Sequence, residues 1–276
     1  MNISNYLKPS NYFRYITFKF MDFCYPKSMT KIIHTKFDNV DMLIRANEDV
    51  GKRILVNQFE IEELNYIKSQ LSNDGVFIDI GANIGIFSLV MAAKSSGIQV
   101  HAFDPIKLNT NLLSTSIEMN GLTNIIVNQT CIGDYDGTVE FSLSSDSAYS
   151  SILDSGRKLE VKKLQVPIVR LDSYVSNMKI TRIDFIKIDV EGAEKLVIEG
   201  ASNVLCTPSL RPKLMMIELC DINLKAFKTS VKEVVDLMIN YKYQPFVVKN
   251  NKLVTFDFKA HANKFDNIFF LNAESI

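Results

Sequence analysis

A turn that contains two glycines carries the first chemical signal in the sequence. Asp79, Gly81, Asn83 and Gly85 lie within seven residues that begin at the end of the largely apolar run Val76–Ile80. Glycine has no Cβ, so the backbone of such a turn can approach a ligand closely. A glycine turn between a strand and a helix is typical of nucleotide-binding α/β folds.

The spacing of this turn selects among nucleotide ligands. A dinucleotide fingerprint needs glycine at its first, third and sixth positions, which here hold Gly81, Asn83 and Ile86. No Lys-Ser or Lys-Thr pair follows, so the P-loop pattern is absent too. S-adenosylmethionine, a nucleoside ligand without a phosphate chain, fits better. Asp79 would contact its cationic part, and Asp104, after the next apolar run, would accept hydrogen bonds from its ribose hydroxyls. The alternative for Asp79 alone is a helix-capping residue.

A second charged cluster follows a later apolar strand. Lys187 and Asp189 alternate with isoleucines, which places both side chains on one face of a strand, where their charges can pair. Such a strand end lies at the carboxyl edge of the sheet, where open α/β sheets bind ligands. Glu191 and Glu194 come next, and acidic residues at a helix N-terminus are favoured by the helix dipole, so capping is an alternative role for them.

Four segments together resemble the FkbM family of S-adenosylmethionine-dependent methyltransferases. They are VFIDIGANIGIFSL (76–89), AFDP (102–105), RLDSY (170–174) and IDFIKIDVEGAEKLVIEGA (183–201). The resemblance extends from about Gln58 to Glu218. The sequence departs from the family at Asp104, where Glu is usual, and at Cys131, where a small residue such as Ala is usual.

The resemblance implies a cofactor, a reaction and a set of site residues. S-adenosylmethionine would be bound by Asp79, Gly81, Asn83, Gly85, Asp104, Cys131 and Asp189, with Cys131 beside the adenine. The methyl group would go to a hydroxyl of a sugar, glycolipid or secondary metabolite. An alcohol acceptor must be positioned and must lose its proton. We expect Asp189 to act as base or orienting group, with Glu218 beside it and Lys187 as charge partner. We assign no metal ligand, and the sequence leaves open whether a divalent metal assists and which carboxylate is the base.

Two other functions stay open at this point. One is a nicotinamide-dependent Rossmann oxidoreductase, which the glycine spacing disfavours. The other is a catalytically silent cofactor-binding module, which the presence of Asp79, Asp104 and Asp189 disfavours.

We expect no nucleic-acid partner, because the 31 Lys and Arg residues equal the 31 Asp and Glu residues and give no global positive charge. The expected acceptor is a small molecule or glycan with a free hydroxyl.

The spacing of apolar residues predicts the elements that hold these residues. From Val76 onward, short apolar runs alternate with helical stretches, which indicates βαβ units around a parallel sheet. We expect a Rossmann-like class I methyltransferase fold: a mostly parallel seven-stranded sheet with helices on both faces, an antiparallel C-terminal strand and an inserted β-hairpin at 138–171. The expected helices are 86–94, 107–120, 193–205 and 231–239. The expected strands are 76–80, 98–103, 125–128, 183–188, 214–219, 246–249, 252–256 and 268–271.

The N-terminal segment differs in composition from the rest. Residues 1–36 contain eight aromatic residues, six Lys or Arg and one Asp. This composition suits contact with a membrane surface, or else a helical arm packed on the core. We place an arm and lead-in at 1–57 and the methyltransferase domain at 58–276.

The four cysteines show no metal-binding or disulfide spacing, and no long apolar run is present, so we expect a cytoplasmic protein. The oligomeric state is left open.

Overall fold

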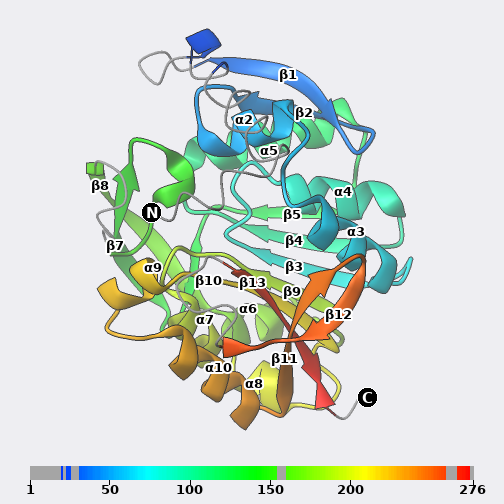
Figure 1. Ribbon diagram of the computed structural model, residues 1–276, viewed down its shortest axis with the longest axis vertical. Coiled ribbons are helices and arrows are strands. Elements are labelled where there is room, and N and C mark those ends of the chain that lie inside the picture. The colour runs from blue at the N-terminus through cyan, green and yellow to red at the C-terminus, as the bar shows by residue number, and fades with distance from the viewer. Residues whose placement is uncertain (1–19, 21–22, 26–30, 154–159, 259–265, 274–276) are drawn as a thin grey trace.

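A central eight-stranded sheet organises the chain (Figure 1). The structure is a computed structural model that describes residues 20, 23–25, 31–153, 160–258 and 266–273. The strand order is β12-β11-β13-β10-β9-β3-β4-β5, and the run from β10 to β5 is parallel. The strands are β3 (Val76–Ile80), β4 (Gln99–Phe103), β5 (Ile125–Asn128), β9 (Phe185–Ile188), β10 (Leu214–Leu219), β11 (Tyr243–Lys249), β12 (Lys252–Thr255) and β13 (Asp266–Asn272).

Helices cover both faces of this sheet. Phe77 and Phe185 belong to one hydrophobic cluster, whereas their chain neighbours Ile78 and Ile186 belong to another, as the alternation of side chains along a strand requires. The first cluster includes apolar residues of α3 (Ile61–Gln70), α4 (Ile86–Lys94) and α5 (Lys107–Met119). The second includes those of α6 (Leu171–Asn177), α7 (Glu194–Gly200), α8 (Ser202–Cys206), α9 (Asp221–Ala226) and α10 (Val231–Asn240). Burial on both sides explains why every residue of β3 and β9 is apolar except Asp79 and Lys187.

The C-terminal strands confirm the expected change of direction. β13 lies antiparallel between β10 and β11, and β11 pairs antiparallel with β12. All eight strands expected by residue range are therefore present, but the sheet has eight strands and not the expected seven, because β12 pairs with β11 at its edge. The single helix expected over 193–205 is wrong in one respect, because the chain forms two helices, α7 and α8, with Ala201 between them.

The inserted hairpin forms a small sheet of its own. β7 (Gly137–Ser144) pairs antiparallel with β8 (Glu160–Arg170), and β6 (Cys131–Gly133) pairs parallel with the end of β8. The hairpin expected at 138–171 is therefore confirmed. Its connection contains the short 3-10 helix η2 (Ser147–Tyr149), while residues 154–159 lie outside the described part. We call residues 145–153 the flap loop.

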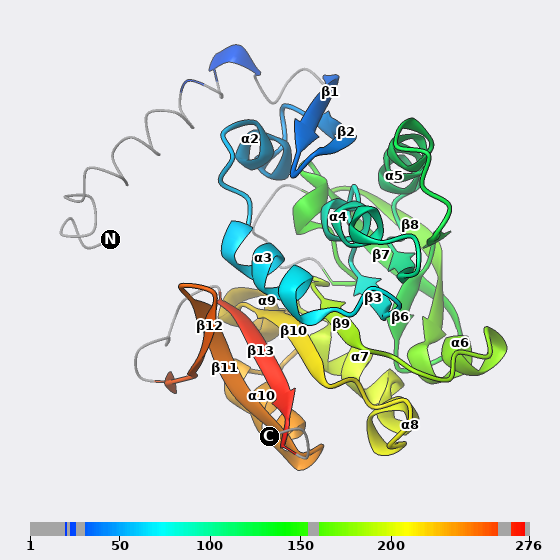
Figure 2. The same cartoon turned by 90° about the vertical axis from the view of Figure 1, so that its right-hand side faces the viewer.

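Residues 31–57, the lead-in, pack on the first hydrophobic cluster. They form the hairpin β1 (Ile32–Phe37) and β2 (Val40–Arg45), followed by α2 (Asp49–Leu55), which lie side by side in both views (Figures 1 and 2). Met42, Ile44 and Ile54 are buried in the cluster.

The boundary drawn at residue 57 stays a prediction. So does membrane contact by residues 1–36, most of which lie outside the described residues. Within the described residues, no helix has the length and apolar character needed to span a membrane.

The turn after β3 is packed tightly against the end of β9. Gly81 has φ +79°, and a Cβ at this position would lie 1.7 Å from the carbonyl oxygen of Asp189. A side chain at Gly81 would therefore push β3 and β9 apart. Gly121, after α5, has a similar φ of +61°, but a Cβ there would meet nothing within 4 Å.

These two glycines give a matched test of the packing. We expect Gly121→Ala to lower the free energy of unfolding by about 1 to 2 kcal/mol, the cost of a left-handed alanine. Gly81→Ala should cost more than about 3 kcal/mol, because the added methyl group also overlaps a backbone carbonyl. Urea unfolding of both variants measures the difference. Equal losses would show that the turn does not depend on this contact.

Candidate active site

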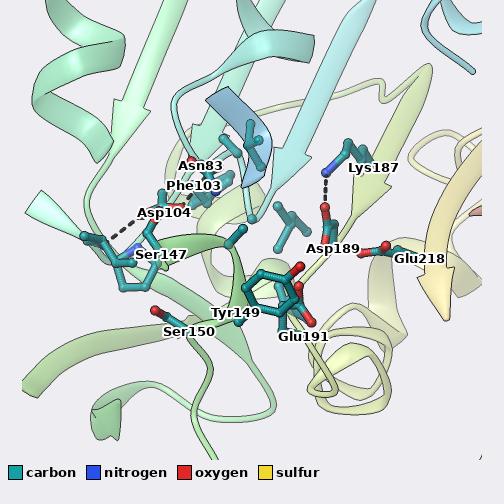
Figure 3. A pocket seen from close by; sticks show the side chains of 18 of the residues that line it. Asn83, Phe103, Asp104, Ser147, Tyr149, Ser150, Lys187, Asp189, Glu191 and Glu218 are labelled. Atoms are coloured by element: carbon teal, nitrogen blue, oxygen red, sulfur yellow. Dashed lines mark hydrogen bonds and ion pairs between the residues drawn. The ribbon is translucent and has the colours of Figure 1, made fainter. Parts of the chain in front are cut away.

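A cavity of about 370 Å³ opens at the carboxyl ends of the central parallel strands (Figure 3). Its volume lies in the range of small-molecule sites. Seven of the residues selected from the sequence line it: Gly81, Asn83, Asp104, Cys131, Lys187, Asp189 and Glu218. Asp79 and Gly85 do not appear in the lining. Gly85 instead makes room for α5, since a Cβ there would lie 2.2 Å from the side chain of Leu113.

The strand register explains why the charged residues meet. Asp79 on β3 is the register partner of Lys187 on β9, and Lys187 is the partner of Met216 on β10. Residues in register point to the same face of a parallel sheet, and so do residues two positions further along. Asp189 and Glu218, each two residues beyond these partners, therefore meet at the strand ends (Figure 3).

Lys187 is a buried ammonium group between two carboxylates. Its Nζ lies 3.0 Å from Oδ2 of Asp189 and 3.9 Å from Oδ1 of Asp79, and its side chain is only 4% exposed. The ammonium also lies 5.2 Å from the centre of the Phe87 ring. Burial alone would lower the pKa of Lys187, but the negative charges of Asp189, Asp79 and Glu60 outweigh burial and raise it above its ordinary value. Lys187 is therefore charged.

Asp79 is held behind the cavity wall and acts on the site through Lys187. It is 1% exposed, and its Oδ2 accepts a hydrogen bond of 2.6 Å from Ser88 Oγ. Burial raises the pKa of Asp79, while the charge of Lys187 and the Ser88 hydrogen bond act in the opposite direction. The structure thus gives Asp79 a partner that the sequence did not indicate.

Three carboxylates converge beside Lys187. One oxygen from each of Asp189, Glu191 and Glu218 lies within 4.8 Å of the others, so the group could orient a hydroxyl or hold a cation. Burial raises the pKa of Glu218 well above its ordinary value, and the charges of Asp189 and Glu191 raise it further. A protonated Glu218 beside an ionised carboxylate can donate a hydrogen bond to it.

Glu60 adds a carboxyl group that the sequence analysis did not select. It lines the cavity just before α3, and burial raises its pKa to about 7. Its Oε2 is buried and has no hydrogen-bond partner among the described residues. The residue lies inside the stretch that resembles the FkbM family, but its sequence position gave no reason to place it beside Lys187.

The opposite side of the cavity is built around Asp104 (Figure 3). This carboxylate, which is 6% exposed, accepts hydrogen bonds from the backbone N–H groups of Asn83 and Ile106, at 3.0 and 2.8 Å, and from the side chain of Asn109 at 3.1 Å. Asn83 has φ +53°, a left-handed conformation that asparagine tolerates better than most residues. The turn can therefore keep its shape without a second internal glycine.

Cys131 lies on the same side and is 7% exposed. Burial raises the pKa of its thiol to about 12, and the charge of Asp104 adds to this effect. The thiol is therefore protonated at neutral pH and contributes a small apolar surface to the cavity. Its contact with adenine stays a prediction.

The glutamates after β9 have different roles. Oε1 of Glu194 accepts hydrogen bonds from the backbone N–H groups of Gly192 and Val190, at 3.0 and 3.4 Å, so Glu194 shapes the turn before α7. Glu191 instead lines the cavity, and Asn223 donates a hydrogen bond to it. Glu194 lies in the first turn of α7, where the helix dipole favours an acidic residue, whereas Glu191 precedes the helix.

The flap loop and the lead-in close the remaining side of the cavity. Tyr149 Oη donates to Oδ2 of Asp49 over 2.8 Å, and the backbone N–H of Asp49 donates to Asp146 over 3.0 Å. Ser151 Oγ donates to the carbonyl of Val190 over 3.0 Å. The first two contacts join segments about 100 residues apart in the chain and the third joins residues 39 apart, and no local pattern in the sequence indicated them.

Fold and site together define a class of enzyme. The parallel run, with antiparallel β13 inserted between β10 and β11, is the sheet of a class I methyltransferase, and its cavity lies at the carboxyl ends of the strands. The chain belongs to the family described as Methyltransferase FkbM domain, whose model matches residues 79–245. The methyl donor of this family is S-adenosylmethionine, so the cofactor inferred from the sequence is confirmed.

Two curated relatives illustrate the family. "Methyltransferase 1" of Beauveria bassiana (strain ARSEF 2860) is 24% identical over 153 residues, which cover 49% of this chain and 61% of the relative. "31-O-demethyl-FK506 methyltransferase FkbM" of Streptomyces tacrolimicus is 24% identical over 162 residues, which cover 49% of this chain and 62% of the relative. The chain thus spans less than two thirds of each relative.

Among solved structures, the chain is similar to M. jannaschii TYW2 in complex with AdoMet. The two have a TM-score of 0.44 and 12% sequence identity, covering 88% of this chain and 86% of that chain. The family assignment depends on the family model and not on this likeness.

The buried carboxyl of Asp104 predicts an unusual pH dependence of stability. Burial raises its pKa to about 7 from an ordinary value of 3.8. Between pH 3.8 and about pH 7 the folded protein binds more protons at Asp104 than the unfolded chain does. The contribution of this proton to the free energy of unfolding is therefore fully present below about pH 4 and is lost as the pH rises through about 7. Burial also raises the pKa values of Glu60 and Glu194 to about 7, which acts in the same direction.

We therefore expect the ligand-free protein to become less stable from pH 5 to pH 8, and Asp104→Asn to reduce that decrease by about 2 to 3 kcal/mol. Urea unfolding at several pH values, with Asp236→Asn on the surface of α10 as control, measures the effect. Parallel curves for wild type and Asp104→Asn would contradict it.

Proposed function

We propose that the chain transfers the methyl group of S-adenosylmethionine to a hydroxyl of a sugar, glycolipid or secondary metabolite. One observation carries the proposal. The cavity has a hydrogen-bonded carboxylate, Asp104, on one side and a carboxylate cluster around a buried ammonium, Lys187, on the other. The first suits the ribose of the cofactor, and the second suits an acceptor that must lose a proton.

The residues on the Asp104 side fit a nucleoside. Oδ2 of Asp104 accepts one hydrogen bond, from Asn83, and a carboxylate oxygen can accept more than one. A ribose hydroxyl could therefore donate to the same oxygen without displacing Asn83. Gly81 keeps the neighbouring wall free of a side chain, and Cys131 offers a small apolar surface for the adenine. These features support a binding site for the nucleoside part of the methyl donor on this side of the cavity.

The residues on the other side would handle the acceptor. When bound, the cofactor supplies an activated methyl group, so the protein must position the acceptor oxygen and remove its proton. Asp189, 27% exposed and paired with Lys187, accepts that proton as the new carbon–oxygen bond forms. Burial raises the pKa of Glu218 well above its ordinary value, which favours the protonated form that donates a hydrogen bond to Asp189 and orients it. Lys187 stays charged throughout and stabilises the ionised form of Asp189.

The name of one relative supports an oxygen as the acceptor atom. The relative from Streptomyces tacrolimicus is called 31-O-demethyl-FK506 methyltransferase, and that name places the methyl group on an oxygen. The acceptor itself is not carried over, since the chain spans 62% of that protein.

Membership in a methyltransferase family removes the reason to consider a nicotinamide-dependent oxidoreductase. A catalytically silent module would have no need for a charged Lys187 between two carboxylates.

Transfer of a labelled methyl group to a panel of hydroxylated metabolites and glycans tests this proposal. We expect wild type to form a product whose label survives mild alkali, as a methyl ether does and a methyl ester does not. Asp189→Asn and Glu218→Gln should each lower the rate about 10²- to 10⁴-fold, since both disturb removal of the proton. Asp236→Asn serves as the surface control.

Three outcomes would contradict the proposal. Alkali-labile label would place the methyl group on a carboxylate and not on a hydroxyl. Full activity of Asp189→Asn would remove the proposed base. Activity lost in EDTA and restored by Mg²⁺ would assign the three carboxylates to a cation instead of the acceptor proton.

A further inference from the structure

A buried polar cluster joins the lead-in to the Asp104 side of the cavity. Its members are Arg45 at the end of β2, Glu48 before α2, Asn109 in the first turn of α5 and Ser147 in η2. Each of them exposes less than a tenth of its surface. Arg45 and Glu48 lie outside the residues that the family model matches. Removing a charged group from water costs free energy unless the group is paired, so Arg45 and Glu48 are expected to have a structural or functional role.

Arg45 determines which way the Asn109 amide faces. A guanidinium group carries only hydrogen-bond donors, and Nη2 of Arg45 donates to Oδ1 of Asn109. The amide nitrogen of Asn109 must then point elsewhere, and it donates to Oδ1 of Asp104 over 3.1 Å. Without the arginine, the amide could rotate and turn its oxygen toward the carboxylate, where the two would repel each other.

The orientation of the Asn109 amide determines how Oδ2 of Asp104 is presented to the cavity. With Oδ1 occupied by Asn109 and by the backbone N–H of Ile106, the carboxylate is fixed, and Oδ2 keeps its single contact with Asn83. A carboxylate fixed in this way needs no reorganisation when a ligand hydroxyl donates to it. Preorganisation of this kind raises affinity because less freedom is lost on binding.

The guanidinium is itself fixed by the other members of the cluster. Nη1 of Arg45 lies 2.8 Å from Oε1 of Glu48, and Nη2 also donates to Ser147 Oγ. Ser147 donates in turn to Oε2 of Glu48 over 2.7 Å. The flap loop, the lead-in and α5 therefore meet at one arginine. In a buried network, each such bond strengthens the next.

We propose that Arg45 is a positioning residue for the ribose of the methyl donor, acting through Asn109 on Asp104. The inference rests on the proposed function. It makes the lead-in a part of the cofactor site, although the matched domain begins at residue 79. Arg45 does not contact the ligand in this account. Its effect reaches the ribose hydroxyls only through the carboxylate that accepts them.

Calorimetric titration with two ligands tests this role. Arg45→Met should weaken binding of S-adenosylhomocysteine about tenfold, but should weaken binding of its 2′,3′-dideoxy analogue less than about twofold, because the analogue has no hydroxyl for Asp104 to accept. Arg45→Lys, which keeps the charge and a hydrogen-bond donor group, should recover part of the affinity. The double variant Arg45→Met/Glu48→Gln avoids an unpaired buried glutamate and should show the same preference if the single variant does not fold.

Arg211→Met is the matched control. Arg211, like Arg45, is at least partly buried, and its Nε donates to the carbonyl of Leu205, which does not line the cavity. It should leave both affinities unchanged. Equal losses for the two ligands in Arg45→Met, or no loss for either, would overturn the positioning role. A folded wild type that binds neither ligand would overturn the proposed function itself, and the inference with it.

Discussion

The charge on one buried ammonium group determines how this site can work. Lys187 lies between Asp79 and Asp189 with almost no access to water, and its positive charge favours the ionised form of both carboxylates. The parallel register of β3 and β9 places the three groups together, and the absence of a side chain at Gly81 lets the two strand ends approach. The fold therefore fixes the electrostatics of the cavity before any ligand arrives.

The two sides of the cavity are separate in chemistry and in origin. The Asp104 side is held by hydrogen bonds from the turn after β3 and from α5, so its carboxylate is an acceptor of fixed direction. The Lys187 side gathers acidic groups from the end of β9, from β10 and from the residue before α3, and their burial, together with their mutual repulsion, favours protonation of Glu218 and Glu60. A methyl donor bound by the first side would present its methyl group to the second.

Local patterns in the sequence predicted a large part of this structure. The limits of β3, α4, β5 and β10 agree with the expected ranges, because buried parallel strands and a helix that begins after a glycine turn have strong local signatures. The meeting of Asp189 and Glu218 also followed, since both end parallel strands. Contacts between distant segments could not be predicted. Arg45 with Asn109, Tyr149 with Asp49 and Gly85 with Leu113 depend on how whole elements pack, and no spacing along the chain records that packing.

The central claim is that the Asp104 side of the cavity binds the methyl donor and the Lys187 side acts on the acceptor. Calorimetric titration with S-adenosylhomocysteine tests this claim most directly. Asp104→Ala should weaken binding about 10- to 100-fold, the range expected for hydrogen bonds to a charged group, whereas Asp189→Ala should change it less than about threefold. Equal losses in the two variants would contradict separate roles. A folded wild type that does not bind would show that the cavity serves another ligand.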